Sequence, residues 1–127
     1  MKKVVFVIPM YNASRHIKDL IESLKEQTNK NWNAVFIDDM SVDDSIDQIK
    51  LSSDGDDRIS VIKNSEKKWA LKNVIETSRK YQDDNNVIIA NLDADDALCN
   101  ENTVDLLLKN YDDKTDSIWT AHSWDIN

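Results

Sequence analysis

Strand-like and helix-like hydrophobic patterns alternate along this 127-residue chain. Five continuous runs of β-branched and other apolar residues are typical of strands buried on both faces; they cover residues 3–8, 34–37, 59–62, 87–90 and 117–121. Stretches with helical spacing separate the runs; they cover residues 14–27, 41–50, 69–81 and a segment capped by Asn100. The alternation predicts an α/β fold, a mostly parallel sheet with helices on both faces. We expect residues 1–127 to form a single domain.

The helical stretches also predict which side chains face the sheet. In the first helix the apolar residues recur at i, i+3, i+4 and i+7; they are Ile17, Leu20, Ile21 and Leu24. In the other helices the expected inward residues are Val42, Ile46 and Ile49, then Leu71, Val74 and Ile75, then Val104, Leu107 and Leu108. Ser41 is expected to cap the second helix.

The charge balance and the cysteine count exclude several kinds of partner and site. Lys and Arg number 16 against 24 Asp and Glu, a formal net charge of −8. Contacts to nucleic-acid phosphates need a basic face, so nucleic acid is excluded as a partner. Cys99 is the only cysteine, which excludes an intrachain disulfide and a cysteine-based zinc site and indicates a cytoplasmic location. No run approaches the roughly 20 apolar residues of a membrane span, so no transmembrane segment is expected.

The glycine count excludes two common kinds of nucleotide site. Gly55 is the only glycine in the chain. The dinucleotide-binding loop and the phosphate-binding P-loop both need several glycines, which let the backbone approach the phosphates closely. Any phosphorylated ligand must therefore be bound by other means.

Acidic residues follow two of the predicted strands directly. Asp38 and Asp39 come after the second strand, and Asp93, Asp95 and Asp96 come after the fourth. The carboxyl ends of parallel strands form the ligand crevice of an open sheet, so these carboxylates are expected to converge there. Mutual repulsion would then be offset by a hard cation such as Mg²⁺ or Mn²⁺, or by donors on a ligand.

Two other interpretations apply to such residues. Aspartates also bond to nearby backbone N–H groups in turns, and Asp38 and Asp39 before Ser41 are compatible with that role alone. A phosphoacceptor receiver domain gathers aspartates at strand ends as well. That fold needs an acidic pair directly after the first strand, where this chain has Pro9-Met10-Tyr11.

Four motifs in order resemble the opening of a family 2 glycosyltransferase. They are VIPMYN at 7–12, LIESLKEQT at 20–28, FIDDMSVDDS at 36–45 and NLDADD at 91–96. Members of that family have the GT-A fold and transfer a sugar from a nucleotide-sugar donor to an acceptor. Singly each motif is weak, but together, with family-like spacing, they cover most of residues 3–105. The resemblance implies a metal-dependent transferase that acts in polysaccharide biosynthesis.

The resemblance also implies roles for individual residues. Pro9 and Tyr11 would lie beside the nucleoside, with the Tyr11 ring near the base. Asp39 would accept a hydrogen bond from uracil N3–H, which makes the donor a UDP-sugar, and Asp38 would lie close by. In the last motif the implied nucleotide-sugar-binding residues are Asp93 and Asp95, and the implied ligands of Mn²⁺ or Mg²⁺ are Asp95 and Asp96.

The segment 64–73 matches the family less closely. The family's element has glycines after its Asn, then an Ala and an Asn near a helix start. Here Asn64, Ala70 and Asn73 are present and the glycines are absent. Lys72 is the predicted phosphate-binding residue, with Lys68 as an alternative; the other interpretation is an exposed lysine at a helix start.

The resemblance places the general base of the reaction downstream of the last acidic motif. Only 31 residues follow Asp96, and the late candidates His122 and Asp125 do not fall where the family places its base. We therefore expect the base to lie outside this chain, and the acceptor to be a saccharide or a lipid-linked hydroxyl, with peripheral membrane contact in the lipid case. The resemblance favours inverting hexosyl transfer. The alternative is a nucleotide-sugar-binding fragment without turnover of its own.

Three tryptophans could stack on a sugar or pack in the core. They are Trp69, Trp119 and Trp124. Trp119 lies within a predicted strand, which favours the core, whereas the place of Trp124 stays open.

Overall fold

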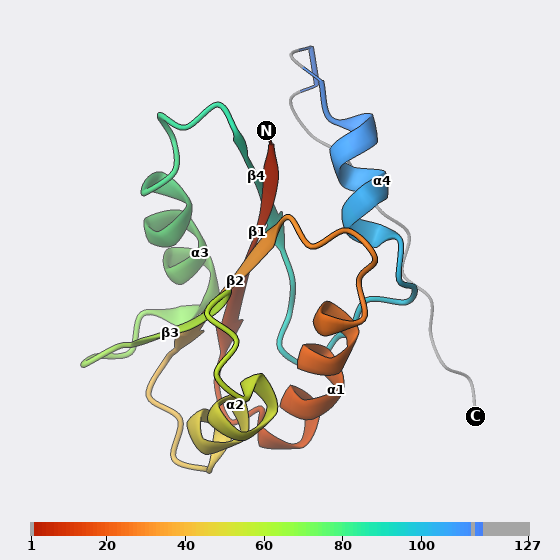
Figure 1. Ribbon diagram of the computed structural model, residues 1–127. Coiled ribbons are helices and arrows are strands. Elements are labelled where there is room, and N and C mark those ends of the chain that lie inside the picture. The colour runs from red at the N-terminus through yellow and green to blue at the C-terminus, as the bar shows by residue number, and fades with distance from the viewer. Residues whose placement is uncertain (1, 113, 116–127) are drawn as a thin grey trace.

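Strands and helices alternate strictly in the structure, as the hydrophobic pattern predicts. The computed structural model describes residues 2–112, 114 and 115. Over these residues the order is β1 (Lys3–Met10), α1 (Ser14–Lys25), β2 (Trp32–Asp38), α2 (Ser45–Ser53), β3 (Ile59–Lys63), α3 (Trp69–Arg79), β4 (Val87–Asn91) and α4 (Thr103–Asn110) (Figure 1). The predicted run 117–121, with Trp119, and the residues His122, Trp124 and Asp125 lie outside the described residues.

The four strands form one parallel sheet in the order β3-β2-β1-β4. β1 lies in the middle, where Val4 pairs with Trp32 of β2 and with Ile88 of β4. At the other end of β1, Met10 is level with Asp38, the last residue of β2. Because all strands point the same way, the segments that follow them meet at one edge of the sheet.

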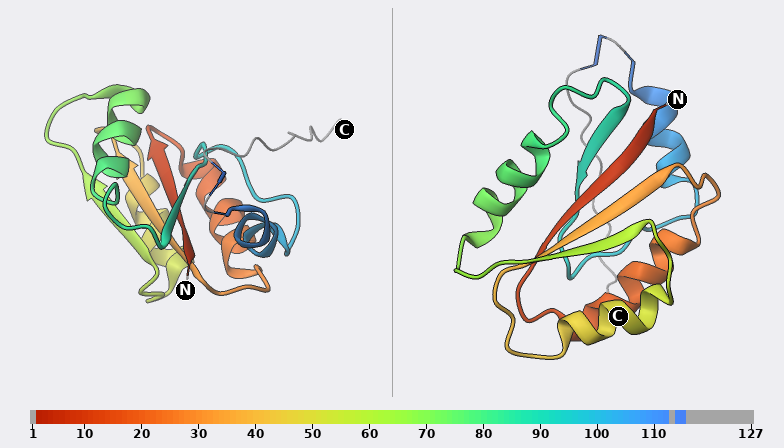
Figure 2. Two further views of the ribbon diagram at one scale, coloured as in Figure 1. Left: turned by 90° about the horizontal axis from the view of Figure 1, so that it is seen from above. Right: turned by 60° about the vertical axis from the view of Figure 1, so that its left-hand side comes forward.

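Helices cover both faces of the sheet, and the two layers differ in size (Figure 2). α1, α2 and α4 cover one face over the larger core cluster, which is centred on Phe6 and Phe36. α3 covers the other face, over a small cluster made by the alternate residues of β1 and β2; its buried members are Val5, Val7, Val35 and Ile37.

Helix α1 supplies most of the helical side of the larger core. The four residues at i, i+3, i+4 and i+7 that predict its inner face are all fully buried; they are Ile17, Leu20, Ile21 and Leu24. The predicted inner residues of α4 are confirmed as well, since Val104 is buried and Leu107 and Leu108 pack against the same core.

Two helix starts differ from the prediction for an identifiable reason. α2 begins at Ser45 rather than at 41, and Val42, predicted to face inward, is 86% exposed. The residues before Ser45 bond to the loop after β1 instead of to a helix: Ser41 Oγ accepts from the Asn12 N–H, and the Val42 N–H donates to Asn12 Oδ1.

The predicted cap at Asn100 is also wrong. α4 begins at Thr103, and the Val104 N–H in its first turn donates to Gln27 Oε1 from the end of α1 (3.0 Å). Gln27 is fully buried and donates in turn to the carbonyl oxygen of Asn100 (2.7 Å). A side chain distant in the sequence thus caps this helix, which no local pattern indicates.

Helix α3 is rotated relative to its predicted face. Val74 packs against the sheet as expected, but Leu71 is exposed and Ile75 is 40% exposed. The buried positions are Asn73 and Thr77. Polar contacts at the start of the helix, described below, orient it. Across the part of the chain that the structure describes, none of the helices has the length and apolar character needed to cross a membrane.

Candidate functional site

The segments after β1, β2 and β4 come together at the carboxyl edge of the sheet. Backbone hydrogen bonds continue past the strand ends: Asp39 N–H donates to Met10 O (3.0 Å) and Asn64 N–H donates to Asp38 O (2.9 Å). On the other side Leu92 N–H donates to Val7 O (3.1 Å). The acidic segments predicted from the sequence are therefore brought to the same edge.

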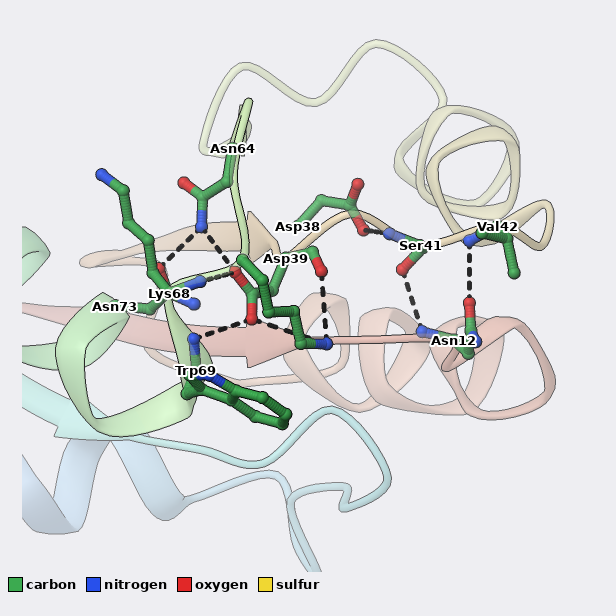
Figure 3. Close-up of polar contacts among 10 residues, drawn as sticks. Asn12, Asp38, Asp39, Ser41, Val42, Asn64, Lys68, Trp69 and Asn73 are labelled. Atoms are coloured by element: carbon green, nitrogen blue, oxygen red, sulfur yellow. Dashed lines mark hydrogen bonds and ion pairs between the residues drawn. The ribbon is translucent and has the colours of Figure 1, made fainter.

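The loop after β1 and the turn after β2 are fastened to each other. Asn12 N–H donates to Ser41 Oγ (2.9 Å), and Val42 N–H donates to Asn12 Oδ1 (2.9 Å). Asn12 and Met40 both have positive φ values, of 49° and 68°. Ser41, predicted as a helix cap, acts instead as an acceptor that holds the two loops together (Figure 3).

Asp43 has a similar structural role at the start of α1. Its carboxylate accepts hydrogen bonds from the Ser14 N–H (3.2 Å) and from the Ser45 N–H (3.0 Å) and hydroxyl. Burial raises the pKa of the Asp43 carboxyl, but the hydrogen bonds from Ser45 and Ser14 outweigh it, so the pKa lies below its ordinary value. The third aspartate of the 36–45 motif thus holds helix ends rather than facing the pocket.

Asp39 is the buried centre of the site. Figure 3 shows the N–H groups of Lys68 and Trp69 pointing at its carboxylate from the start of α3; they donate at 2.8 and 2.9 Å. The Asn64 amide donates to Asp39 Oδ1 at 2.9 Å and to Asn73 Oδ1 at 2.8 Å. Burial raises the pKa of Asp39, but the donors from Lys68, Asn64, Trp69 and Asn73 outweigh it and lower the pKa to about 2. Asp39 is therefore ionised and caps α3, where a negative charge is also favoured by the helix dipole.

Asp38 differs from its neighbour. Its side chain is buried, and Oδ1 accepts a hydrogen bond from the Ser41 N–H at 3.3 Å. It is absent from the residues that line the pocket described next. Asp38 thus helps to shape the turn after β2.

A small pocket of about 190 Å³ opens beside Asp39. Its lining comes from the end of β1, the turn after β2 and the start of α3; it consists of Pro9, Met10, Tyr11, Asp39, Lys67, Trp69, Ala70 and Asn73. Two aromatic rings stand at its mouth, since Tyr11 is 52% and Trp69 71% exposed. Three of the residues predicted to bind the nucleotide, Pro9, Tyr11 and Asp39, are therefore brought together in one cavity.

Two lining residues have features that indicate a binding site. Trp69 has a positive φ of 68°, which costs on the order of 1–3 kcal/mol for a residue of this kind and is found mostly at functional sites. Asn73 is 2% exposed, and its Nδ2 makes no hydrogen bond within the described part of the chain, although its amide contributes to the low pKa of Asp39. A buried amide donor at a pocket wall is available to a ligand acceptor.

The acidic motif after β4 forms a cluster of oxygen donors. One carboxylate oxygen from each of Asp93, Asp95 and Asp96 lies within 4.8 Å of the other two. Asp93 and Asp95 are exposed, and a backbone bond from Asp96 N–H to Asp93 O (3.0 Å) holds the turn. Carboxylate oxygens with access to water are the ligands that Mg²⁺ and Mn²⁺ favour, so these residues fit such a cation.

The chain after this cluster is anchored to the end of α1. Leu98 N–H donates to Ser23 Oγ (3.0 Å), Gln27 bonds to Asn100, and Thr28 N–H donates to Glu101 O (2.8 Å). Gln27 and Thr28 belong to the second motif singled out from the sequence. Their role is to position the segment that carries the acidic cluster.

The lysines near the site divide into two groups. Lys68, directly before α3, and Lys72, on α3, have their ammonium groups 3.0 and 3.9 Å from Glu76 carboxylate oxygens. Lys67 lines the pocket, with its ammonium 3.7 Å from Asp39 Oδ2 and 3.2 Å from the centre of the Tyr11 ring. Sequence reasoning missed Lys67, because no local pattern shows which side chains turn toward a cavity. Asn73 was matched to the family's element but was given no role.

Comparison with known proteins identifies the family. The sequence model described as Glycosyl transferase family 2 matches residues 5–124, nearly the whole chain. The chain belongs to glycosyl transferase family 2. The resemblance inferred from the four motifs is thus confirmed.

Two curated relatives from Bacillus subtilis (strain 168) match this family 2 chain in part. The protein named "Putative teichuronic acid biosynthesis glycosyltransferase TuaG" is 36% identical over 62 residues, which cover 48% of this chain and 25% of that protein. The protein named "Putative glycosyltransferase EpsE" is 34% identical over 67 residues, which cover 52% of this chain and 24% of that protein. The match thus spans about a quarter of each relative's length.

Solved structures confirm the fold of the family 2 chain. A mannosyltransferase from Pyrobaculum calidifontis, solved with GDP-Man and Mn²⁺, superposes with a TM-score of 0.72 at 17% identity, over 84% of this chain and 31% of the other. Residues 1–349 of TarS from S. aureus, solved with UDP-GlcNAc, superpose with a TM-score of 0.68 at 20% identity, over 84% of this chain and 30% of the other. The expected GT-A type of α/β fold is therefore confirmed.

Proposed function

We propose that this chain is the donor-binding part of a metal-dependent transferase that moves a hexosyl group from a UDP-sugar to an acceptor hydroxyl, with inversion. The observation that carries the proposal is the pairing of two features at the ends of neighbouring strands. A pocket lined by Tyr11 and Asp39 lies after β1 and β2, and the three-carboxylate cluster lies after β4. A nucleotide diphosphate needs both a recess for its base and a cation for its phosphates.

The pocket supports a uracil nucleotide. Its volume of about 190 Å³ is below the roughly 300–1,000 Å³ of sites that enclose a drug-sized ligand, which favours one ring with the rest of the nucleotide outside. Asp39 Oδ2 accepts one hydrogen bond from the described protein residues, from Trp69 N–H. A carboxylate oxygen has two lone pairs, so Oδ2 can also accept from uracil N3–H.

The acidic cluster supports the metal dependence. In the proposal Asp95 and Asp96 hold Mn²⁺ or Mg²⁺, and Asp93 and Asp95 contact the nucleotide-sugar. When bound, the cation would stabilise the negative charge that develops on the leaving diphosphate. Asp38 stabilises the turn after β2, which carries Asp39. Lys72 would leave the Glu76 carboxylate and bind a phosphate of the nucleotide instead.

The acceptor and the general base complete the proposal. We assign the base to residues outside this chain, and the acceptor to a saccharide or a lipid-linked hydroxyl in polysaccharide biosynthesis. The published names of the relatives support this class, since one is described as acting in teichuronic acid biosynthesis. A chain with one cysteine is suited to the reducing cytoplasm, where we place the reaction.

Calorimetric titration of UDP into the protein, with and without Mn²⁺, tests the proposal. We expect binding that needs Mn²⁺ and is lost in Asp96→Ala and in Asp39→Ala, but not in the exposed control Asp83→Ala. GDP in place of UDP tests the choice of base, and we expect weaker binding. Circular dichroism of each variant shows whether a loss reflects unfolding, and Asp96→Ala, at the surface cluster, is expected to fold.

The opposite result has a definite meaning. UDP binding that ignores Mn²⁺ and both substitutions would show that the aspartates serve only turns and helix caps. Binding of a UDP-sugar with no release of UDP in the presence of acceptor saccharides would show that this chain binds the donor without turnover.

A further inference from the structure

Lys67 contacts Tyr11 and Asp39, the two residues that bind the nucleotide base in the proposed function. Its ammonium lies 3.2 Å from the centre of the Tyr11 ring and 4.9 Å from the centre of the Trp69 ring. The same ammonium lies 3.7 Å from Asp39 Oδ2 and 3.5 Å from the Asp39 carbonyl oxygen. The side chain is 29% exposed, so the lysine is folded over the pocket rather than extended into water.

These contacts exclude a base from the same place. A cation above the centre of an aromatic ring is attracted by the negative ring face, within about 6 Å. A distance of 3.2 Å leaves no room for a second ring on that face of Tyr11, because stacked rings are themselves in van der Waals contact. The ammonium also approaches Oδ2, the Asp39 oxygen that would accept from a base N–H.

We propose that Lys67 occupies the base position in the nucleotide-free protein and must leave it before a base can stack on Tyr11. Lys67 then weakens the binding of any ligand whose base stacks on Tyr11, by the free energy of the contacts that the lysine must give up. This inference rests on the proposed function, since it takes the base to bind between Tyr11 and Asp39.

The surrounding backbone allows the side chain to move alone. The N–H groups of Lys68 and Trp69, directly after Lys67, are both bonded to Asp39 at 2.8 and 2.9 Å. The loop therefore stays in place when the ammonium leaves, and a lysine stem has four rotatable bonds with which to turn outward. Asp39 keeps its other donors in that state, so its charge stays compensated.

Nuclear magnetic resonance of ¹³C-labelled lysine tests the contact in the free protein. Methylene protons over a ring face are shifted upfield, so the Lys67 ε-methylene signal is expected upfield of the other lysines. Tyr11→Leu should remove most of this shift and leave only the part that comes from the more distant Trp69 ring. Addition of UDP with Mn²⁺ should also return it, as the base displaces the ammonium.

Titration with uridine measures the competition, because uridine has no phosphate to attract the lysine. We expect Lys67→Ala to bind uridine about two- to fivefold more tightly than the wild type, which is the range for an exposed cation–ring contact. Lys67→Arg keeps the cation and should bind as weakly as the wild type. Lys63→Ala removes an exposed lysine nearby and is the charge-matched control.

The outcomes separate this inference from the proposed function. If UDP binds while the Lys67 signal stays upfield, or if Lys67→Ala binds uridine no better than the wild type, the competition is wrong and the nucleotide site stands. The Lys67 signal could be upfield in the free protein while UDP with Mn²⁺ leaves that signal in place and gives no heat of binding. In that case the nucleotide site itself is wrong, and this inference falls with it.

Discussion

Two groups of aspartates lie at the same edge of the sheet and differ in almost every physical respect. Asp39 is 4% exposed and accepts hydrogen bonds from Asn64, Lys68 and Trp69. Asp93 and Asp95 are exposed, and their carboxylates have no hydrogen-bond or ion-pair partner among the described residues. The fold itself compensates the carboxylate of Asp39, whereas the charges of Asp93 and Asp95 are left to be compensated by a bound cation.

The difference shows which carboxylate charges the protein itself compensates and which ones a bound cation would compensate. Removing a buried acceptor leaves its donors without partners, which is costly. Removing one of several exposed like charges costs the fold little and relieves repulsion. Both groups should matter for UDP binding, but substitution of Asp39 should lower stability, whereas substitution of Asp95 should leave it unchanged or raise it slightly.

The largest effect is expected for Asp39→Ala. Two backbone N–H groups and the Asn64 amide would lose their acceptor, so we expect a loss of about 3 kcal/mol in the free energy of unfolding. Urea denaturation measures it, with the exposed Asp83→Ala as the matched control. A loss of less than about 1 kcal/mol would mean that water replaces the carboxylate and that Asp39 is not built into the fold.

The cluster should show the reverse pattern. We expect Asp95→Ala to weaken Mn²⁺-dependent UDP binding about 100-fold, since even groups behind a metal ligand contribute about 10- to 100-fold. In metal-free buffer its unfolding free energy should equal that of the wild type or rise slightly. Calorimetry and urea denaturation check the two parts. A variant that loses stability but keeps metal-dependent binding would remove the distinction between the two groups.

Acid titration sharpens the comparison through the pKa of Asp39. The pKa falls from 3.8 to about 2 on folding, so the stabilisation is complete above pH 4 and is lost as the pH falls through 2. One pKa unit corresponds to about 1.4 kcal/mol, so we expect Asp39 to contribute about 2 kcal/mol. Asp56, whose pKa is also lowered to about 2 by the Arg58 guanidinium, adds to the same transition.

The difference between wild type and Asp39→Asn isolates the contribution of Asp39. Between pH 2 and pH 6 the unfolding free energy of the wild type should rise by about 2 kcal/mol more than that of the variant. Equal slopes in the two proteins would show that Asp39 is not held ionised by the fold.

The smallest effect is expected for Asn64→Ala. Its amide is shared between Asp39 Oδ1 and Asn73 Oδ1, so we expect a loss of about 1 kcal/mol. In the Asp39→Ala background the same substitution should cost less, because one of the two acceptors is already gone. Urea denaturation of the four proteins of this cycle measures the coupling, and strict additivity would contradict it.

Much of the fold could be predicted because its signals are local. Hydrophobic spacing within a few residues indicates each strand and helix, and the order of the elements then predicts a parallel sheet. The same order also predicts that the acidic residues after β2 and β4 lie at one edge of the sheet. Where a helix start depends on distant contacts, as at Val42 and Asn100, local spacing gave the wrong answer.

The sequence by itself determined that this chain is an α/β sheet with carboxylates at one edge, because periodicity and strand-end residues are properties of neighbours along the chain. Only the tertiary structure decided that Gln27 caps α4, that Asp39 accepts hydrogen bonds from the start of α3, and that the Lys67 ammonium lies over the Tyr11 ring. Each of these contacts joins segments far apart in the sequence, and each depends on the three-dimensional packing that sets which polar groups are left to pair with one another.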